Sequence, residues 1–313
     1  MKLVMVGQGA FAKKHLDGLA RIQGVEVVSI AGGSPDSTKA VAEKYKIPHW
    51  TTKLDESLAQ PGVEAAILTS PTQVHASQAI QCLRAGKHVH IEIPIADNLA
   101  DSEKILATQK ETGLIAMAGH TRRFNPSHQW IHNRIKKGEL KLQHLVVQTF
   151  FFRRTNMNAE GKPRSWTDHL LWHHACHTVD LFKYQTGEEA QHVQALQGPM
   201  HPELKIAMDM SIGMKTKSGA LCTLSLSFNN EGPLGTFFRY ICDNGTYIAR
   251  YDDLVDGNEK PIDVSKVAVS KDGIELQDRE FISAIQEKRE PNASVAQVLP
   301  AMRTLDRLEK SLR

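Results

Sequence analysis

The sequence predicts an α/β fold: a doubly wound parallel sheet of the Rossmann type, followed by an α+β domain with a large, mostly antiparallel open sheet. Apolar strand patterns alternate with helical segments as far as residue 118, and long strand patterns joined by hairpin turns dominate after residue 191. The chain has 313 residues, more than one compact core usually holds. We therefore expect a first domain at 1–119 and a second at 120–313.

The first domain opens with an apolar run at 2–6, which is typical of a buried parallel strand. Further strands are expected at 25–30, 65–69, 88–92 and 114–118, with helices at 35–45, 54–58 and 99–112 and one that ends at Arg84. Five or six strands with helices between them predict a doubly wound sheet. The loops at the carboxyl ends of its strands are expected to line a crevice for a cofactor.

The second domain is expected to begin with a helix at 126–137. Strands are predicted at 142–154, 192–196, 206–215, 220–229, 236–242, 247–251 and 264–269, and helices at 279–288 and 294–312. The residues Lys217-Ser218-Gly219 and Asp243-Asn244-Gly245 are typical of hairpin turns, so we predict that the sheet is antiparallel. So few helices leave one sheet face without a cover, so we predict a homodimer packed sheet to sheet.

A glycine motif follows the first strand and precedes a helical stretch. It reads Gly7-Gln8-Gly9-Ala10-Phe11-Ala12, the G-x-G-x-x-A form of the dinucleotide fingerprint. Gly7 permits a tight turn, Gly9 lets the backbone approach a pyrophosphate, and Ala12 keeps helix and strand close. Ala10 and Phe11 complete the turn, and the helix start offers free N–H groups to the phosphates.

The end of the second strand favours NADP over NAD. An NAD enzyme usually has an acidic residue there, which binds the ribose 2′-hydroxyl. This chain has Ala31-Gly32-Gly33-Ser34 instead, so no carboxylate repels a 2′-phosphate. Ser34, Ser37, Thr38 and Lys39 are candidates to contact that phosphate. No arginine marks the site, so NAD is also permitted.

Residues 164–180 are the predicted chemical centre. On a helix, His169, His173 and His177 fall at i, i+4 and i+8 and project from one stripe, with Asp180 a turn later. Imidazole titrates near neutrality and therefore suits proton transfer. The alternative is a helix with hydrogen-bonded core histidines. We predict no metal site, because three ligands on successive turns span about 12 Å at ~1.5 Å per residue.

Arginines cluster in sequence around this segment. Arg122 and Arg123 are adjacent, as are Arg153 and Arg154, and Arg164 follows. Guanidinium groups bind carboxylates in a bidentate fork, so the set predicts an anionic, dicarboxylate substrate. For any single arginine the alternative is ordinary surface charge.

Composition excludes several classes of protein. A net charge of +3 without a basic run argues against nucleic acid, and no apolar stretch is long enough to span a membrane. The four cysteines lie far apart with no CxxC pair, which argues against structural zinc and a disulfide framework. Reduced thiols and a cytoplasmic location are the expectation.

Several motifs resemble the glucose–fructose oxidoreductase / inositol dehydrogenase family in order and spacing. They are Gly7-x-Gly9-x-x-Ala12, Ser70-Pro71-x-x-x-His75, Ala85-Gly86-Lys87-His88-Val89, Glu92-Ile93-Pro94, the segment 119–126 and His177-x-x-Asp180. The resemblance implies an NAD(P)-dependent dehydrogenase and a homodimer, with Ser70, Pro71, His75, Glu92 and Pro94 at the cofactor. Two departures stand out: Ile93 replaces the family's active-site lysine, and His173 replaces its aspartate.

Segments 119–129, 151–158 and 164–174 narrow the resemblance to members that act on an anionic substrate. It implies oxidation of the cyclic hemiacetal of a dicarboxylate with NADP as acceptor. His177 or His173 would be the base, with Asp180 orienting His177, and Trp166 would wall the nicotinamide. Arg122, Arg123, Arg153, Arg154, Arg164 and His173 would bind the substrate. The alternatives are a sugar or dihydrodiol dehydrogenase, a dinucleotide-sensing protein and a metal-dependent lyase.

Overall fold

The computed structural model describes residues 1–157, 161, 163–164 and 166–312, and it divides into two compact units. The first unit comprises Met1–Thr121 and Ile274–Leu299, and the second comprises Arg122–Gly273 and Pro300–Arg313. The first crossing lies two residues beyond the predicted boundary. The return of Ile274–Leu299 to the first unit differs from the prediction, which assigned everything after residue 119 to the second domain.

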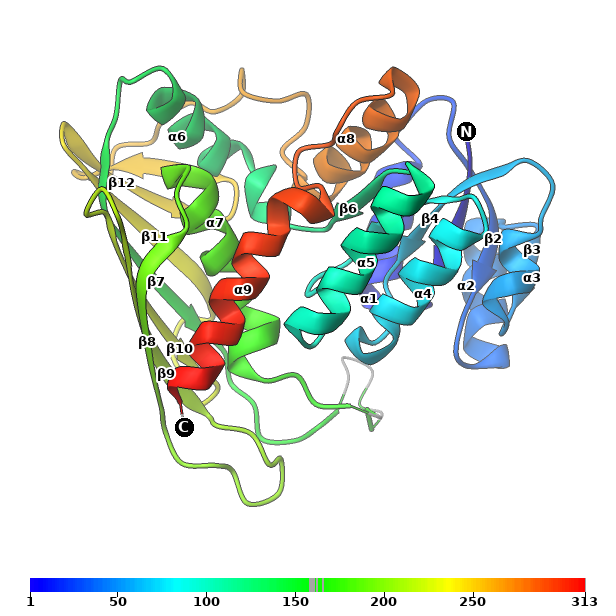
Figure 1. Cartoon of the computed structure of the whole chain (residues 1–313), viewed down its shortest axis with the longest axis horizontal. Helices are drawn as coiled ribbons and strands as arrows, with labels where there is room; N and C mark the ends of the chain where they lie inside the picture. Colours follow the sequence, from blue (N-terminus) through cyan, green and yellow to red (C-terminus); the bar gives the residue numbers. More distant parts are fainter. Residues whose placement is uncertain (158–160, 162, 165, 313) are drawn as a thin grey trace. The chain divides into compact units, whose positions relative to one another are not determined.

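The first unit is built on a six-stranded parallel sheet with the order β3-β2-β1-β4-β5-β6 (Figure 1). Its strands are β1 (Lys2–Val6), β2 (Glu26–Ala31), β3 (His49–Thr51), β4 (Val63–Leu68), β5 (His88–Ile91) and β6 (Ala116–Ala118). Its helices include α1 (Ala10–Leu19), α2 (Pro35–Tyr45), α3 (Leu54–Leu58), α4 (Thr72–Arg84) and α5 (Leu99–Thr112). Strands β2 and β3 lie on one side of β1, and β4, β5 and β6 lie on the other, so the order in which strands are added reverses at β1, as in a doubly wound fold.

The observed boundaries follow local signals. Helices α2, α3 and α5 occupy the residues that the sequence predicted. Asn98 caps α5 by accepting a 2.8 Å hydrogen bond from the N–H of Asp101, and Gly113 ends it with a φ of 68°. Strand β3 was not predicted, because it has three residues and its Trp50 is exposed at the edge of the sheet.

Helix α8 (Gly273–Glu287) packs against α1 inside the first unit. A Cβ on Gly18 would lie 3.3 Å from the Cα of Glu275, so the glycine allows the two backbones to approach closely. Arg21 Nε donates to Glu275 at 2.6 Å. His15, buried on α1, lies 2.8 Å from a carboxylate oxygen of Asp278. The later part of the chain therefore helps to complete the core of the first unit.

The second unit contains a seven-stranded sheet with the order β13-β12-β11-β7-β10-β9-β8. The strands are β7 (Leu142–Phe150), β8 (Ala190–Gln197), β9 (Asp209–Thr216), β10 (Leu221–Ser227), β11 (Gly235–Cys242), β12 (Gly245–Arg250) and β13 (Asp253–Asp256). Only the β7–β10 pair is parallel, so the sheet is mostly antiparallel as predicted. The predicted strand at 264–269 is wrong: Val267 N–H closes a turn on Val264, and β13 forms the edge instead.

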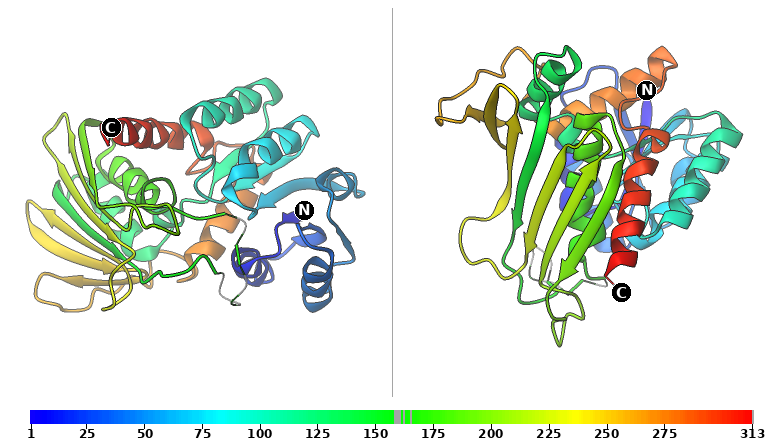
Figure 2. Two further views of the ribbon diagram at one scale, coloured as in Figure 1. Left: turned by 90° about the horizontal axis from the view of Figure 1, so that it is seen from below. Right: turned by 60° about the vertical axis from the view of Figure 1, so that its left-hand side comes forward.

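Helices cover one face of this sheet. They are α6 (Pro126–Lys136), the π-helix η2 (Leu170–Ala175), α7 (Cys176–Thr186) and the end of α9 (Val295–Ser311). Figure 2 shows the strands as a curved layer with α7 on one side. On β10, Cys222, Leu224 and Leu226 are buried against the helices, whereas Leu221 and Thr223 point to the other face and are exposed.

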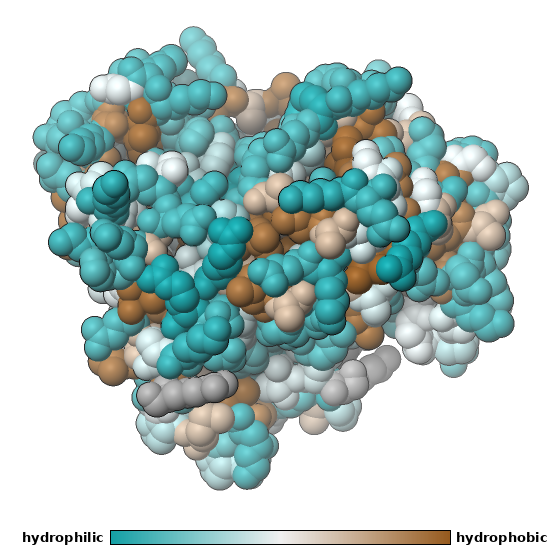
Figure 3. Space-filling view, viewed as in Figure 1, coloured by the Kyte–Doolittle hydropathy of each residue, from teal (hydrophilic) through white to brown (hydrophobic). Residues whose placement is uncertain are grey.

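No helix among the described residues is long and apolar enough to cross a membrane. On the side of the protein drawn in Figure 3, hydrophilic side chains predominate, and apolar residues appear in small groups between them.

Candidate functional site

The carboxyl ends of β1 and β4 meet at a glycine that no other residue could replace without strain. Gly7 has a φ of +110°, and a Cβ there would lie 2.5 Å from Thr69 Oγ1 and 2.8 Å from its backbone carbonyl. Its N–H donates to Ala31 at 2.7 Å, while the N–H of Thr69 donates to Val6 at 2.7 Å. The ends of β1, β2 and β4 are therefore held together at the switch point, where doubly wound folds bind nucleotides.

Helix α1 begins at this point in a form that fits a pyrophosphate. Gly9 is its N-cap, with no side-chain cap, and a Cβ there would meet nothing within 4 Å. Ala10 and Phe11 are exposed, whereas Ala12 is fully buried against the sheet, as the motif predicted. No side chain caps the first-turn N–H groups and Gly9 leaves room beside them, so the residues of this turn fit the phosphates of a dinucleotide.

In the loop after β2 and the first turns of α2, one of the residues predicted to contact the ribose 2′-phosphate has a structural role instead. Thr38 is completely buried, and its hydroxyl donates to the carbonyl of Ser34 at 2.6 Å, so it stabilises the start of α2 rather than contacting a ligand. Ser34 is half-buried and Lys39 is exposed, with only a 3.8 Å pair to Glu43. Gln8, which was not predicted, accepts from the N–H of Gly33 at 3.1 Å. Ser34 and Lys39 remain candidates for the phosphate.

His75 and Glu92, which the family motifs imply lie at the cofactor, are buried side chains that make hydrogen bonds to or from the loops after β4 and β5. His75 is buried, with one ring nitrogen 2.7 Å from the carbonyl of Ser70 and the other 2.9 Å from that of Pro94. Glu92 is buried too, and one of its oxygens accepts from His15 at 3.1 Å and from Gln277 at 3.0 Å. Both side chains therefore hold loops in position, and their predicted place at the cofactor stays a prediction. Pro71 is exposed at the start of α4 and stays a candidate.

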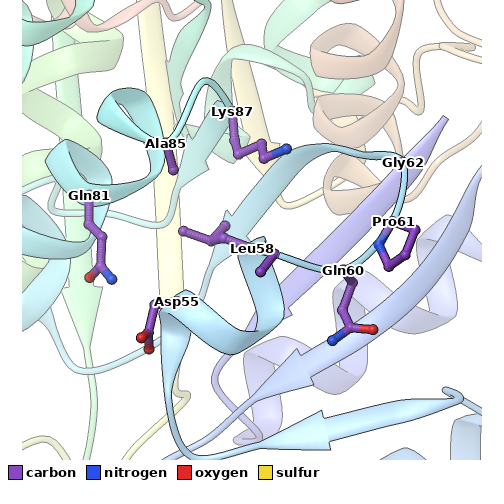
Figure 4. A pocket seen from close by; sticks show the side chains of 9 residues that line it. Asp55, Leu58, Gln60, Pro61, Gly62, Gln81, Ala85 and Lys87 are labelled. Carbon is purple, nitrogen blue, oxygen red and sulfur yellow. The ribbon is translucent and has the colours of Figure 1, made fainter.

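A shallow pocket lies at the opposite end of the same sheet (Figure 4). It is lined by Asp55 and Leu58 of α3, by the turn before β4, and by Gln81, Ala85 and Lys87 near the end of α4. These residues precede β4 and β5, so the pocket lies at the amino ends of the strands. Because nucleotides bind at the carboxyl ends in this fold, the pocket is not the cofactor site.

The predicted histidine helix has a different geometry from the one expected. His169 precedes the helix in an extended conformation, Leu170–Ala175 form the π-helix η2, and α7 begins only at Cys176. The prediction that His169, His173 and His177 share one α-helical stripe is therefore wrong. π-Helical turns are rare and frequently occur at functional sites. Asn158 and Ser165, which belong to the segments that showed the family resemblance, lie outside the described residues.

His173 is held from three sides. Its ring stacks on Trp166 with centroids 5.3 Å apart and meets the ring of His169 edge-on at 4.7 Å. The backbone N–H of His169 donates to His173 Nδ1 at 3.2 Å. When the ring is neutral, its proton must therefore lie on Nε2. His177 follows η2 in the first turn of α7 and is half-buried.

The two adjacent arginines have different surroundings. Arg123 is buried and forms a bidentate pair with Asp180, Nε to Oδ2 at 2.8 Å and Nη2 to Oδ1 at 2.6 Å. The pair gives Arg123 a structural partner that the sequence did not predict, while the predicted roles of Arg123 toward the substrate and of Asp180 toward His177 stay predictions. Arg122 lies over the rings of Phe238 and Tyr251, and its buried Nε has no acceptor among the described residues. Arg122 remains a candidate for a carboxylate.

A residue that the sequence reading missed joins the other arginines. Asp168, in the loop before η2, accepts from the two terminal nitrogens of the Arg153 guanidinium, from Arg164 at 2.9 Å and from His174 Nε2 at 3.0 Å. Burial alone would raise the pKa of Asp168, but the hydrogen bonds from His174 and Arg153 outweigh it and hold that pKa well below its usual range. The i, i+4 spacing of Arg164 and Asp168 was the one signal in the sequence.

Arg154 is the outermost of the five arginines. It is exposed, stacks on Phe152 at 4.2 Å, and donates to the side-chain oxygen of Asn229 at 3.1 Å. No carboxylate among the described residues pairs with it. It therefore stays a candidate for binding an anion at the surface.

Both parts of the chain match models of known protein families. Residues 1–120 match the model of the oxidoreductase family with an NAD-binding Rossmann fold, and residues 126–268 match that of the C-terminal part of bacterial oxidoreductases. In structure, the chain resembles levoglucosan dehydrogenase in complex with NADH, with a TM-score of 0.88 and 17% identity over 99% of this chain and 96% of that one. It also resembles an oxidoreductase from Agrobacterium radiobacter in complex with NAD+, L-tartaric acid and magnesium, with a TM-score of 0.85, 15% identity and coverage of 99% and 96%.

Sequence relatives include close and distant proteins. The chain is 64% identical over 312 residues, 100% of this chain and 99% of the other, to 4-carboxy-2-hydroxymuconate-6-semialdehyde dehydrogenase of Sphingobium sp. (strain NBRC 103272 / SYK-6). It is 26% identical over 62% of this chain and 58% of the other to myo-inositol 2-dehydrogenase of Thermotoga maritima. The chain therefore belongs to the oxidoreductase family with an NAD-binding Rossmann fold, the glucose–fructose oxidoreductase / inositol dehydrogenase family that its motifs resemble.

Proposed function

We propose that this protein oxidises the cyclic hemiacetal of 4-carboxy-2-hydroxymuconate-6-semialdehyde to 2-pyrone-4,6-dicarboxylate. The observation that carries the proposal is 64% identity along the whole chain to a dehydrogenase of that substrate. Oxidation of the hemiacetal CH–OH to a lactone carbonyl removes one hydride and one proton. A nicotinamide nucleotide supplies the hydride acceptor when it is bound, so the side chains must provide the base and hold the substrate.

We assign the proton transfer to His177. His173 already accepts a hydrogen bond at Nδ1 and carries its proton on Nε2 when neutral, so it cannot take up a proton without losing that bond. His173 is better suited to donate a hydrogen bond through Nε2 than to act as the base. A positioned histidine base typically contributes about 10²–10⁴ in rate. A hemiacetal hydroxyl is more acidic than that of a polyol, which fits a site with Ile93 in place of the family's lysine.

The carboxylates of the substrate need cationic groups that retain unused donors. Arg122 qualifies through its Nε, and Arg153, Arg154 and Arg164 qualify through guanidinium groups that are partly or fully exposed. Both substrate and product carry these carboxylates, so such contacts set binding and orientation more than the chemical step. Trp166, stacked on His173, keeps its proposed place as a wall for the nicotinamide.

For the cofactor we propose NADP, with NAD as a weaker alternative. No carboxylate ends β2, while Ser34 and Lys39 are available for a 2′-phosphate. We also propose a homodimer formed through the exposed face of the second sheet, where Leu221 of β10 and Leu196 of β8 are 41% and 64% exposed. A cytoplasmic location is proposed because no disulfide joins any of the four cysteines.

The experiment that tests the function uses the purified chain and the ring-cleavage product of protocatechuate. Formation of NADPH is followed by absorbance, and the assay is repeated with NAD and with a neutral sugar as substrate. We expect turnover of the semialdehyde and formation of the pyrone dicarboxylate. Oxidation of the sugar without turnover of the semialdehyde would overturn the proposal in favour of a sugar dehydrogenase.

A further inference from the structure

The cluster around Asp168 contains more cationic than anionic groups. Two guanidinium groups and one imidazole converge on a single carboxylate, from Arg153, Arg164 and His174. Among the described residues no second carboxylate lies within ion-pair distance of either arginine. With His174 neutral, the cluster still carries one positive charge, and burying such a charge is costly unless an anion compensates it.

The exposed fractions show which part of the cluster a ligand can reach. The side chain of Asp168 is 10% exposed, whereas those of Arg153, His174 and Arg164 are 15%, 18% and 29% exposed. The carboxylate therefore lies beneath the three donors, whose outer edges are the accessible part. Aromatic rings fix these donors further: Arg153 lies 4.7 Å over Phe228, and His174 meets the same ring edge-on at 5.1 Å.

We infer that Asp168 is a positioning residue that holds Arg153, Arg164 and His174 together as a receptor for one carboxylate of the substrate. Its bidentate bond fixes the plane of the Arg153 guanidinium, and its second contacts keep Arg164 and His174 beside it. Without this carboxylate the two guanidinium groups would repel each other and separate. The inference rests on the proposed function, because it names the residues that recognise the dicarboxylate, and it adds Asp168 and His174 to the candidate site.

This receptor would act in substrate recognition rather than in the chemical step, so its loss should change the selectivity of the protein between ligands. A substrate or product with both carboxylates should bind better than an analogue that lacks one of them, because only the former uses the receptor. Loss of Asp168 should reduce that preference. A purely structural Asp168 would lower the stability of the fold without changing the preference for two carboxylates.

The test compares Asp168→Asn, Asp168→Glu and His174→Gln with the unaltered chain. Binding of 2-pyrone-4,6-dicarboxylate and of an analogue with one carboxylate is measured by calorimetry, and KM and kcat are measured with the semialdehyde. For Asp168→Asn we expect a rise of about tenfold or more in KM and in the Kd of the dicarboxylate, with a smaller change in kcat. Asp168→Glu should recover part of the affinity, and His174→Gln, which keeps an N–H donor, should lose less. Asp306→Asn, which removes only a surface pair with Lys310 on α9, serves as the control.

The possible outcomes separate the two proposals. If the unaltered chain neither turns over the semialdehyde nor binds the dicarboxylate, both the function and the receptor are overturned. If it turns over the semialdehyde but Asp168→Asn keeps the preference for two carboxylates, only the receptor is overturned. A fall in KM for Asp168→Asn would also overturn it, because Asp168 would then compete with the substrate for the arginines. If Asp168→Asn does not fold, the Kd values of Asp168→Glu and His174→Gln decide.

Discussion

The guanidinium of Arg123 and the carboxylate of Asp180 face each other in the interior of the second unit, joined by hydrogen bonds of 2.8 and 2.6 Å. Each side chain is 1% exposed. The pair links the segment that precedes α6 to the middle of α7, and Arg123 also lies 4.9 Å over the ring of Tyr184 on α7. His177, three residues before Asp180, therefore lies on a helix that this pair holds in position.

Breaking this pair should destabilise the fold more than it changes the chemistry. Asp180→Asn leaves a buried guanidinium without its counter-charge, and loss of one partner of a buried pair typically costs about 3–5 kcal/mol. Urea unfolding measures the loss, with Arg122→Gln as the comparison, because Arg122 forms no ion pair with a carboxylate among the described residues. Equal stability of both variants would show that the Arg123–Asp180 pair contributes nothing specific.

The buried His15 and its two carboxylate partners predict how the stability of the fold depends on pH. Burial alone would lower the pKa of His15, but Asp278 and Glu92 outweigh it and raise the pKa from 6.5 to about 10. Because the folded state raises this pKa, the stabilisation is fully present below pH 6.5 and is lost as the pH rises towards 10. His15→Gln should lower stability at pH 6 and flatten the decline at alkaline pH. Thermal unfolding between pH 6 and pH 10 tests this, with His192→Gln on the exposed end of β8 as control.

Substitution of the two glycines of the first motif should have different effects, one on stability and the other on cofactor binding. Gly7→Ala places a Cβ against Thr69 at a φ of +110°, so we expect a loss of stability of about 1–3 kcal/mol. Gly9→Ala meets no neighbouring atom and should fold normally. If a pyrophosphate approaches Gly9, this variant should lose cofactor affinity by about tenfold, or ~1.4 kcal/mol. Thermal unfolding and calorimetric titration with NADP separate the two effects. Unchanged affinity in Gly9→Ala would place the phosphates elsewhere.

Preference for NADP should depend on Lys39 and not on Thr38. Lys39→Ala removes the exposed cation in the second turn of α2, so KM for NADP should rise several-fold while KM for NAD stays constant. Lys44→Ala near the end of the same helix is the matched control. A parallel rise for both cofactors would mean that Lys39 does not contact the 2′-phosphate.

The first unit was largely predictable because its signals are local. Pro35 at the start of α2, Asn98 before α5 and Gly113 after it specify helix boundaries without help from distant residues. The site was less predictable because its partners are distant in sequence. Arg123 and Asp180 are 57 positions apart, and nothing in the pattern around either residue favours their pairing. The π-helix also escaped prediction, because its residues have the same apolar and histidine pattern as an α-helix and only packing selects the wider turn.

The assignment of the base between two histidines can be decided by isosteric substitutions. His177→Asn and His177→Gln remove the proposed base, so kcat should fall by about 10²–10⁴. At His173, Gln keeps an N–H donor near the position of Nε2, whereas Asn keeps only polar atoms near Nδ1. If His173 acts as a donor, His173→Gln should retain much more activity than His173→Asn, while both His177 variants stay inactive. Steady-state kinetics as a function of pH completes the comparison, because loss of the base should remove the acidic limb of the kcat profile. Normal turnover in His177→Asn together with an inactive His173→Gln would transfer the role of base to His173.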